Sequence, residues 1–163
     1  MGTSWGHLNI NVSDLGRSIE FYERLGFSMM IEAIPHLGLS LNEEATLTDA
    51  LCVAYGLPIG TRALGCILQL DHGLPKLDLT QYVLPDAAEP LVAGALGCER
   101  LCLAVRDLPA EIDRLERAGV TFVGGAASGA LDLAQVAVCL DPDGTRIELI
   151  QLDLRRFVEL GYA

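Results

Sequence analysis

The feature that most constrains this fold is an internal repeat. Residues 66–81 reappear in pattern at residues 136–151, at an offset of 70 positions (136 minus 66). Each copy contains a strand-like run, a glycine-containing turn and a second alternating run, which together predict a β-hairpin. The second run of each hairpin carries one carboxylate, Asp78 in the first copy and Glu148 in the second. The same hairpin is therefore expected twice, with an acid at matching strand positions.

A second repeat opens each copy. Residues 7–15 match residues 100–108 at an offset of 93 positions, and the similarity continues to the glycines Gly26 and Gly119. Each segment has the pattern of a strand, then an acid that can cap a helix, then apolar residues at helical spacing that end at the glycine. Because both repeats keep the same order, we predict two βαβββ modules, the first longer by 23 residues (93 minus 70).

These repeats divide the chain into parts of a single domain, residues 1–163. The expected parts are a first module at residues 7–82 with an insertion at 33–65, a linker at 83–98, a second module at 99–151, and a terminal helix at 152–163. Residues 45–55 predict a short helix within the insertion. An insertion of this kind over an open sheet more often forms a lid or one wall of a pocket than a separate domain.

Composition and charge exclude several classes of protein. A hydrophobic content of 51% predicts a folded, globular chain. The net charge of −11 opposes binding to a nucleic-acid backbone. The apolar runs are far shorter than the ~18 residues that span a bilayer, and no basic-then-apolar leader opens the sequence. The five cysteines lack CxxC spacing, which favours reduced thiols, so we expect a cytoplasmic protein without nucleic-acid or membrane partners.

The first strand has an unusually polar face. His7, Asn9 and Asn11 alternate with apolar residues, so all three side chains are expected on one face of that strand. By the same alternation, four later residues are candidates to line a polar cavity with them. They are Thr80, Tyr82, Cys102 and Gln135. A polar strand face in a folded chain needs a functional explanation.

Other polar residues are predicted to have structural roles. Asp71, His72 and residues 141–144 lie in hairpin turns, where such residues provide turn chemistry. His36 lies in the insertion and could reach a ligand, but we expect an ordinary solvent-exposed loop histidine.

Residues 14–27 and 141–149, together with the two modules, resemble the vicinal oxygen chelate superfamily. This superfamily includes glyoxalase I, methylmalonyl-CoA epimerase, extradiol dioxygenases, fosfomycin-resistance enzymes and bleomycin-resistance proteins. The resemblance covers nearly the whole chain. It implies an α+β fold in which the paired βαβββ modules form a cupped eight-stranded mixed sheet with helices on its outer side. It also implies a small-molecule substrate or ligand and a homodimer.

The resemblance further implies a site at four strand positions, which face into the cupped sheet in metal-using members. Here these positions hold His7, Asp78, Arg100 and Glu148. The histidine and the two acids suit a divalent metal such as Fe, Mn, Ni, Co or Zn. Arg100 cannot coordinate a metal, and at ~4 Å and an effective dielectric near 20 it would repel a divalent ion by roughly twice 4 kcal/mol. The arginine either replaces the ion as a cation, by pairing with Asp78 and Glu148 or with an anionic substrate, or extends to solvent.

Two functional hypotheses follow. The first is an enzyme that acts on a small oxygenated organic molecule as an isomerase, epimerase, lyase or, with iron, a dioxygenase. Glu148 or His7 would be the general base, and a metal or Arg100 would hold the developing enolate or oxyanion. The alternative is a metal-free protein that sequesters a drug or metabolite, as bleomycin-resistance proteins do. A third possibility, a catalytically silent member, predicts no ligand in the cavity.

Overall fold

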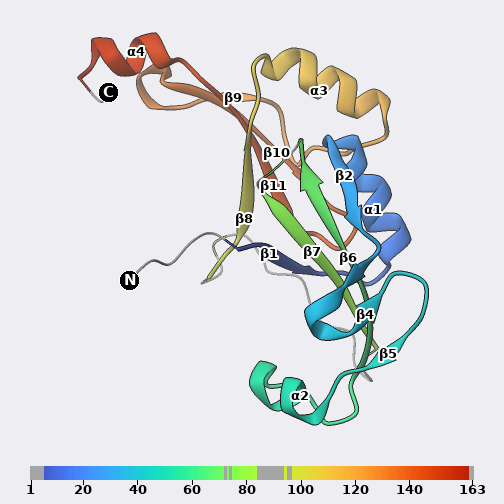
Figure 1. The fold of residues 1–163 in the computed structure, drawn as a ribbon. Helices are drawn as coiled ribbons and strands as arrows, with labels where there is room; N and C mark the ends of the chain where they lie inside the picture. Colours follow the sequence, from blue (N-terminus) through green and yellow to red (C-terminus); the bar gives the residue numbers. More distant parts are fainter. Residues whose placement is uncertain (1–5, 72, 74, 84–93, 95–96, 162–163) are drawn as a thin grey trace. The chain divides into compact units, whose positions relative to one another are not determined.

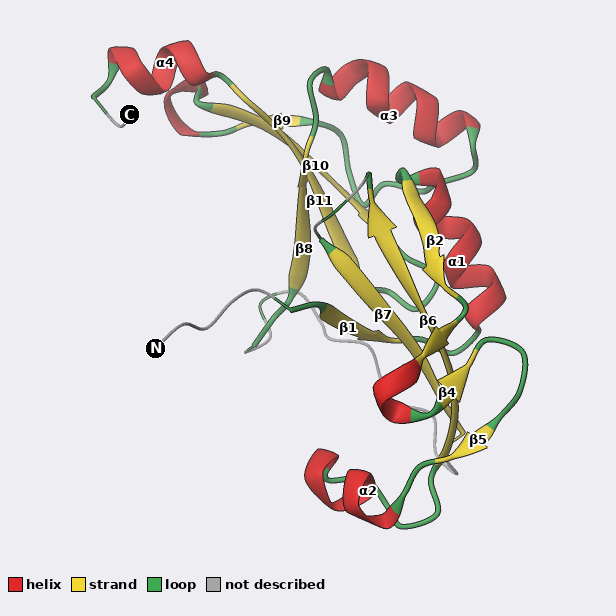
Figure 2. Ribbon diagram, viewed as in Figure 1, coloured by secondary structure: helices red, strands yellow, loops and turns green. Residues whose placement is uncertain are grey.

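The computed structural model describes residues 6–71, 73, 75–83, 94 and 97–161. The chain divides into two compact units, Met1–Ala88 and Glu89–Ala163, and each is described by itself. Each unit contains a mixed β-sheet and helices, so the predicted α+β fold class is confirmed (Figures 1 and 2). The predicted linker at 83–98 lies mostly outside the described residues. Among those residues, no helix is both long and apolar enough to cross a membrane.

The first unit is built on a five-stranded sheet. Its strands are, in spatial order, β1 (Leu8–Asn11), β7 (Lys76–Val83), β6 (Arg62–Leu70) and β2 (Phe27–Ile31), with β5 (Ala45–Thr46) also paired to β6. β1 and β7 run parallel, whereas the other neighbours are antiparallel. The β1–β7 register places Asn9 opposite Asp78, so these two side chains lie on one face of the sheet.

Helix α1 (Leu15–Arg24) packs against β2 and β7. It begins at Asp14, whose carboxylate accepts a hydrogen bond from the Arg17 N–H at 2.9 Å. The fully buried Tyr22 lies edge-on to Phe27, with the two ring centroids 5.8 Å apart. These contacts pack α1 against one face of the first sheet.

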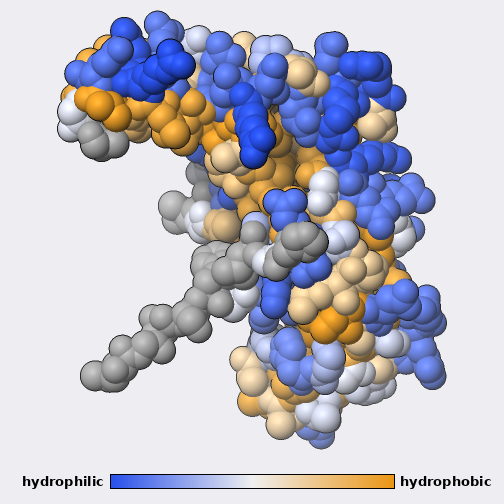
Figure 3. All heavy atoms as spheres, turned by 45° about the horizontal axis from the view of Figure 1, so that its top comes forward, coloured by the Kyte–Doolittle hydropathy of each residue, from blue (hydrophilic) through white to orange (hydrophobic). Residues whose placement is uncertain are grey.

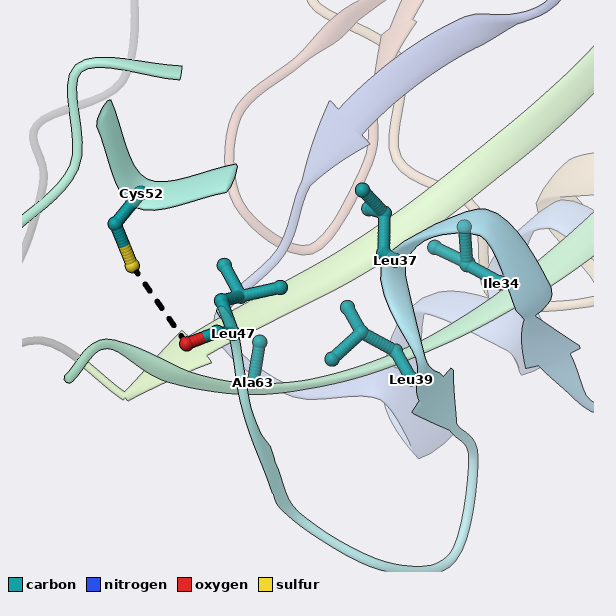
Figure 4. Close-up of a cluster of buried hydrophobic side chains, with 6 residues drawn as sticks. All are labelled: Ile34, Leu37, Leu39, Leu47, Cys52 and Ala63. Atoms are coloured by element: carbon teal, nitrogen blue, oxygen red, sulfur yellow. Dashed lines mark hydrogen bonds between the residues drawn. The ribbon is translucent and has the colours of Figure 1, made fainter. Parts of the chain in front are cut away.

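The insertion packs on the opposite face. It contains β3 (Ala33–Ile34), the 3-10 turn η1 (Pro35–Leu37), β4 (Leu39–Ser40), β5 and α2 (Asp49–Tyr55). Its buried side chains, with one from β6, are drawn in Figure 4: Ile34, Leu37, Leu39, Leu47, Cys52 and Ala63. Gly65 allows Ile34 to pack closely on β6, because a Cβ at Gly65 would lie 2.5 Å from Ile34 Cδ1. Gly65 pairs with Thr80, two residues from Asp78, so the insertion covers the face that carries this acid.

The second unit repeats this plan with a four-stranded sheet. Its strands are, in spatial order, β8 (Arg100–Ala104), β11 (Arg146–Leu152), β10 (Ala134–Leu140) and β9 (Ala127–Ser128). β8 and β11 run parallel, as β1 and β7 do in the first unit. Helix α3 (Leu108–Arg117) begins at its cap Asp107 and contacts β10 and β11. The 3-10 turn η2 (Ala130–Asp132) and the short helix α4 (Leu154–Glu159) complete the unit.

Both modules anchor their first helix through a glutamine. Gln81 Oε1 accepts a hydrogen bond from the Leu15 N–H at 2.9 Å, and Gln151 Oε1 accepts one from the Leu108 N–H at 2.6 Å. Each bond satisfies one of the N–H groups that a helix start leaves unpaired. The acid-bearing strand of each module is thus tied to the helix of the same module.

One predicted strand is almost absent. In the second predicted βαβββ module a strand should follow α3 as β2 follows α1, but residues 120–123 form only a single bridge, between Phe122 and Cys139. Gly124 and Gly125 follow directly, and glycine offers no side chain to stabilise an extended strand. The second sheet therefore lacks a full strand at this position.

The two predicted minor helices are shorter than expected. α2 begins at Asp49, not residue 45, because Ala45–Thr46 pair with β6 as β5. α4 spans six residues within the predicted 152–163, because β11 continues to Leu152. Figure 3 shows hydrophobic beside hydrophilic surface around α4, where Leu154 and Val158 are 67% and 61% exposed.

Candidate functional site

A histidine and an acid meet at the edge of the first sheet. His7 directly precedes β1, and Asp78 lies on the neighbouring strand β7. His7 Nε2 lies 3.4 Å from Asp78 Oδ2. The His7 side chain is 42% exposed, whereas that of Asp78 is 2% exposed. The pair therefore presents an accessible imidazole backed by a buried carboxylate.

His36 joins this pair from the insertion. Its ring centroid lies 5.8 Å from that of His7, and the candidate ligand atoms of His7, His36 and Asp78 all lie within 4.8 Å of one another. His36 is exposed, as expected, but the sequence did not predict that it lies beside His7 and Asp78. The sequence carries no direct signal for this contact, because it depends on the path of the insertion across the sheet.

The carboxyl group of Asp78 is buried without hydrogen-bond partners for both of its oxygens in the described part of the chain. Its Oδ1 atom is buried and has no hydrogen-bond partner among the described residues. Desolvation raises the pKa of this carboxyl group, while the charges of His7 and His36 act in the opposite direction. A buried, unpaired carboxylate oxygen favours a proton or a cation beside it. Two imidazoles and a carboxylate are also a donor set that fits a divalent transition metal.

Cys66 lies on the strand next to Asp78 but on the other face of the sheet. It is fully buried and pairs with Leu79. Burial, and then the charges of Asp78 and Glu32, raise the pKa of this thiol to about 12. The thiol therefore stays protonated near neutral pH and is unsuited to bind a metal or attack a substrate.

The predicted cavity residues of the first unit differ in their surroundings. Asn9 Nδ2 donates hydrogen bonds to Thr80 Oγ1 at 2.8 Å and to the Asp78 backbone oxygen at 3.2 Å. Thr80 is fully buried, and Tyr82 packs against the core of the insertion. Asn11 is exposed at the end of β1. Asn9 thus holds β1 to β7, and the role of these residues in lining a ligand cavity stays a prediction.

The matching positions of the second unit hold a different pair. Arg100 Nε donates to Glu148 Oε2 at 2.5 Å across the parallel strands β8 and β11. Arg100 Nη1 also donates to Glu99 Oε2 at 3.1 Å. The hydrogen bond and charge of Glu148, followed by the charge of Glu99, raise the pKa of the guanidinium. Arg100 therefore stays charged, and its side chain is still 52% exposed.

Cys102 faces Glu148 across the same pair of strands. Burial and then the Glu148 charge raise the pKa of this thiol, whereas Arg100 lowers it. Gln135 takes a different position from the one expected. It lines a cleft of about 570 Å³ near the end of β11, together with Gln151 and Arg155. Neither Cys102 nor Glu148 lines that cleft.

The predicted metal set is divided between the two units. His7 and Asp78 are in contact in the first unit, whereas Glu148 belongs to the second unit and is paired with Arg100. A shared role of the three in metal binding stays a prediction. The sequence analysis noted that His36 could reach a ligand but favoured an ordinary loop histidine, and it missed Glu99, which adjoins Arg100 in the chain.

Comparisons with known proteins support the resemblance. Over residues 4–149 the chain matches the family model described as the glyoxalase/bleomycin resistance protein/dioxygenase superfamily. It is 28% identical to a lactoylglutathione lyase of Pseudomonas aeruginosa, covering 92% of this chain and 83% of the relative. It is 31% identical to a probable lactoylglutathione lyase of Vibrio parahaemolyticus, covering 89% and 88%.

Solved structures agree on the fold alone. A glyoxalase family protein from Bacillus cereus matches with a TM-score of 0.68 at 18% identity, over 91% of this chain and 93% of that one. The trypanothione-dependent glyoxalase I of Leishmania major matches with a TM-score of 0.58 at 22% identity, over 96% of each chain. Because the family model matches residues 4–149, the chain belongs to the glyoxalase/bleomycin resistance protein/dioxygenase superfamily, as its resemblance to the vicinal oxygen chelate superfamily implied.

Proposed function

We propose that this protein is an enzyme that moves a proton on a small oxygenated organic molecule while a cation holds the developing enolate or oxyanion. The observation that carries the proposal is the His7–Asp78 pair. An imidazole that reaches solvent lies 3.4 Å from a carboxylate that is 2% exposed. A carboxylate that orients an accessible imidazole is typical of histidine general bases. Membership of the superfamily supports the same class of chemistry.

His7 is the stronger candidate for the general base. Asp78 Oδ2 lies 3.4 Å from His7 Nε2 and can orient the ring, while the His7 side chain remains 42% exposed beside His36. Glu148 is the alternative base, but one of its oxygens already accepts a hydrogen bond from Arg100. A substrate would have to compete with that charged partner for Glu148.

Two cations are available to this scheme. A divalent metal held by His7 and Asp78 would, when bound, polarise a substrate oxygen as a Lewis acid, and Glu148 would then be the base because His7 would be a ligand. Arg100 offers a permanent positive charge with a fork geometry that matches carboxylates and enolates, and half of its side chain is exposed. The residues of each unit can be tested separately, because the two cations belong to different units.

The names of the relatives favour lyase or isomerase chemistry over oxygen insertion. Of the two relatives described above, one is named a lactoylglutathione lyase and the other a probable lactoylglutathione lyase. We propose that this protein acts on the same general type of molecule, in which an acidic C–H group adjoins a carbonyl. Lactoylglutathione is then the first compound to test, followed by small 2-hydroxy and 2-oxo acids and thioesters.

The test is exchange of that C–H group with deuterated solvent, followed by NMR together with product formation. We expect exchange with the unmodified protein and a loss on the order of 100-fold or more in His7→Gln, because general bases contribute about that much. Glu159→Gln, which changes an exposed acid in α4, is the matched control and should keep the activity. Unchanged exchange in both His7→Gln and Glu148→Gln would contradict the proposal. Saturable binding without exchange or product would favour the sequestering alternative.

A further inference from the structure

We propose that His36 is the third protein ligand of a transition-metal site that the first unit forms alone, with His7 and Asp78 as the other two ligands. The strand positions that the family resemblance implies do not include His36. The inference rests on the proposed function in one respect: it takes the metal, and not Arg100, to be the cation of that scheme.

The first support is the set of donor atoms. The His7–Asp78 separation of 3.4 Å already suits a shared ion, because two ligands at about 2.1 Å from one metal lie no more than about 4.2 Å apart. The three candidate ligand atoms lie within 4.8 Å of one another, so His36 needs only a small side-chain movement. Both histidine side chains are exposed and can make it.

The second support is the orphaned oxygen of Asp78. Its Oδ1 atom is buried and has no hydrogen-bond partner among the described residues, although the residue lies in a well-packed strand. A buried carboxylate normally satisfies both oxygens. A cation shared with the two histidines would compensate for this burial. Two histidines and one carboxylate also leave open coordination positions, as in non-haem iron oxygenases, for a chelating substrate.

The third support is the way in which the insertion holds His36. Its neighbours Ile34 and Leu37 are buried in the cluster of Figure 4, and Ile34 packs directly over Gly65. Gly38 ends the turn in the left-handed conformation at φ 70°, which glycine adopts without strain. The backbone at His36 is thus fixed, while its side chain remains exposed beside His7.

The fourth support is that this set needs no residue of the second unit. Glu148 is engaged by Arg100, and Arg100 would repel a divalent ion that used Glu148 as a ligand. A site composed of His7, His36 and Asp78 avoids both problems. It also explains how the chain can retain metal binding although an arginine replaces one of the family's ligands.

The experiment is metal titration of the metal-depleted, untagged full chain with Co²⁺ and Zn²⁺, followed by calorimetry and by the visible spectrum of bound Co²⁺. We expect one ion per chain. His36→Gln, His7→Gln and Asp78→Asn should each weaken binding by at least about 10- to 100-fold, since loss of an outer partner alone costs that much. Glu148→Gln should bind within about 2-fold of the unmodified protein.

Glu44→Gln is the matched control within the insertion, because Glu44 is a partly exposed acid that pairs with Arg62. Circular dichroism of each variant confirms its folding, and His36→Gln changes only an exposed side chain. Unchanged affinity in His36→Gln would overturn the inference, as would loss of the metal in Glu148→Gln or the absence of any binding. Tight binding without turnover would leave the inference standing and contradict the enzyme. Turnover by a protein that binds no metal would overturn the inference and leave the enzyme proposal with Arg100 as its cation.

Discussion

Arg100 donates a hydrogen bond to Glu148 from the position in the second module that matches His7, which contacts Asp78 in the first. The same pair of parallel strands thus carries a base and an acid in both modules. The chemistry of the two pairs differs, however. An imidazole can take up or release a proton near neutral pH and can bind a metal, whereas a guanidinium can do neither. The two modules therefore share the geometry of the pair, but only in the first pair can the basic residue transfer a proton or bind a metal.

Replacing Arg100 with histidine should create metal binding in the second module. Arg100→His would place an imidazole beside Glu148, as His7 lies beside Asp78, and would remove a positive charge that repels cations. We expect elemental analysis of untagged protein to show more metal per chain than in the unmodified protein. Arg155→His, at an exposed position in α4, is the matched control. Equal metal content in Arg100→His and the unmodified protein would exclude a latent site at these strand positions.

The repeat explains which parts of this molecule are predictable from the sequence. Strand alternation and matched positions fix the faces of β7 and β11, so the neighbours of Asp78 and Glu148 on β1 and β8 follow directly. The place of His36 does not follow, because the contact of Ile34 with Gly65 sets the path of the insertion. That contact joins residues 31 positions apart (65 minus 34), and no local sequence pattern predicts it.

Adding a methyl group at Gly65 should displace the insertion. The Cβ of Gly65→Ala would lie 2.5 Å from Ile34 Cδ1, so we expect a loss of about 1–3 kcal/mol in the free energy of unfolding by urea. Ile34→Val removes Cδ1 and should recover part of this loss in the double variant. Gly125→Ala, where a Cβ meets nothing within 4 Å, is the control. Additive effects of Gly65→Ala and Ile34→Val would show that the two sites are independent.

The Gln81 side chain should stabilise α1 from the neighbouring strand. Gln81→Met keeps the length of the side chain but removes the oxygen that accepts the Leu15 N–H. We expect the free energy of unfolding to fall by about 1 kcal/mol, the typical contribution of one such hydrogen bond. Gln69→Met on β6 is the matched control, and chemical denaturation measures both. An equal loss of unfolding free energy in the two variants would show that removing any strand glutamine amide has this effect, and that the bond to the start of α1 does not cause it.

The thiols should divide into reactive and protected groups at pH 8. Cys98 and Cys102 are exposed, whereas Cys52, Cys66 and Cys139 are buried. Burial raises the pKa of Cys66 to about 12, so almost none of this thiol is ionised at pH 8. We expect mass spectrometry after maleimide treatment of the native protein to find two labelled positions, and five after unfolding. Native labelling of Cys66 at the rate of Cys98 would contradict the packing of β6.

Asp78 should destabilise the metal-free protein and stabilise the metal-bound one. Desolvation raises the pKa of its carboxyl group in the folded state, so the stability that this group provides is present below its ordinary value near 3.8 and is lost as the pH rises. At pH 7 without metal, Asp78→Asn should therefore unfold at the same or a higher temperature than the unmodified protein. Co²⁺ at 100 times its Kd should stabilise the unmodified protein by about 2.7 kcal/mol and leave Asp78→Asn unchanged. A metal-free Asp78→Asn protein that is clearly less stable would show that the carboxylate is satisfied without a cation.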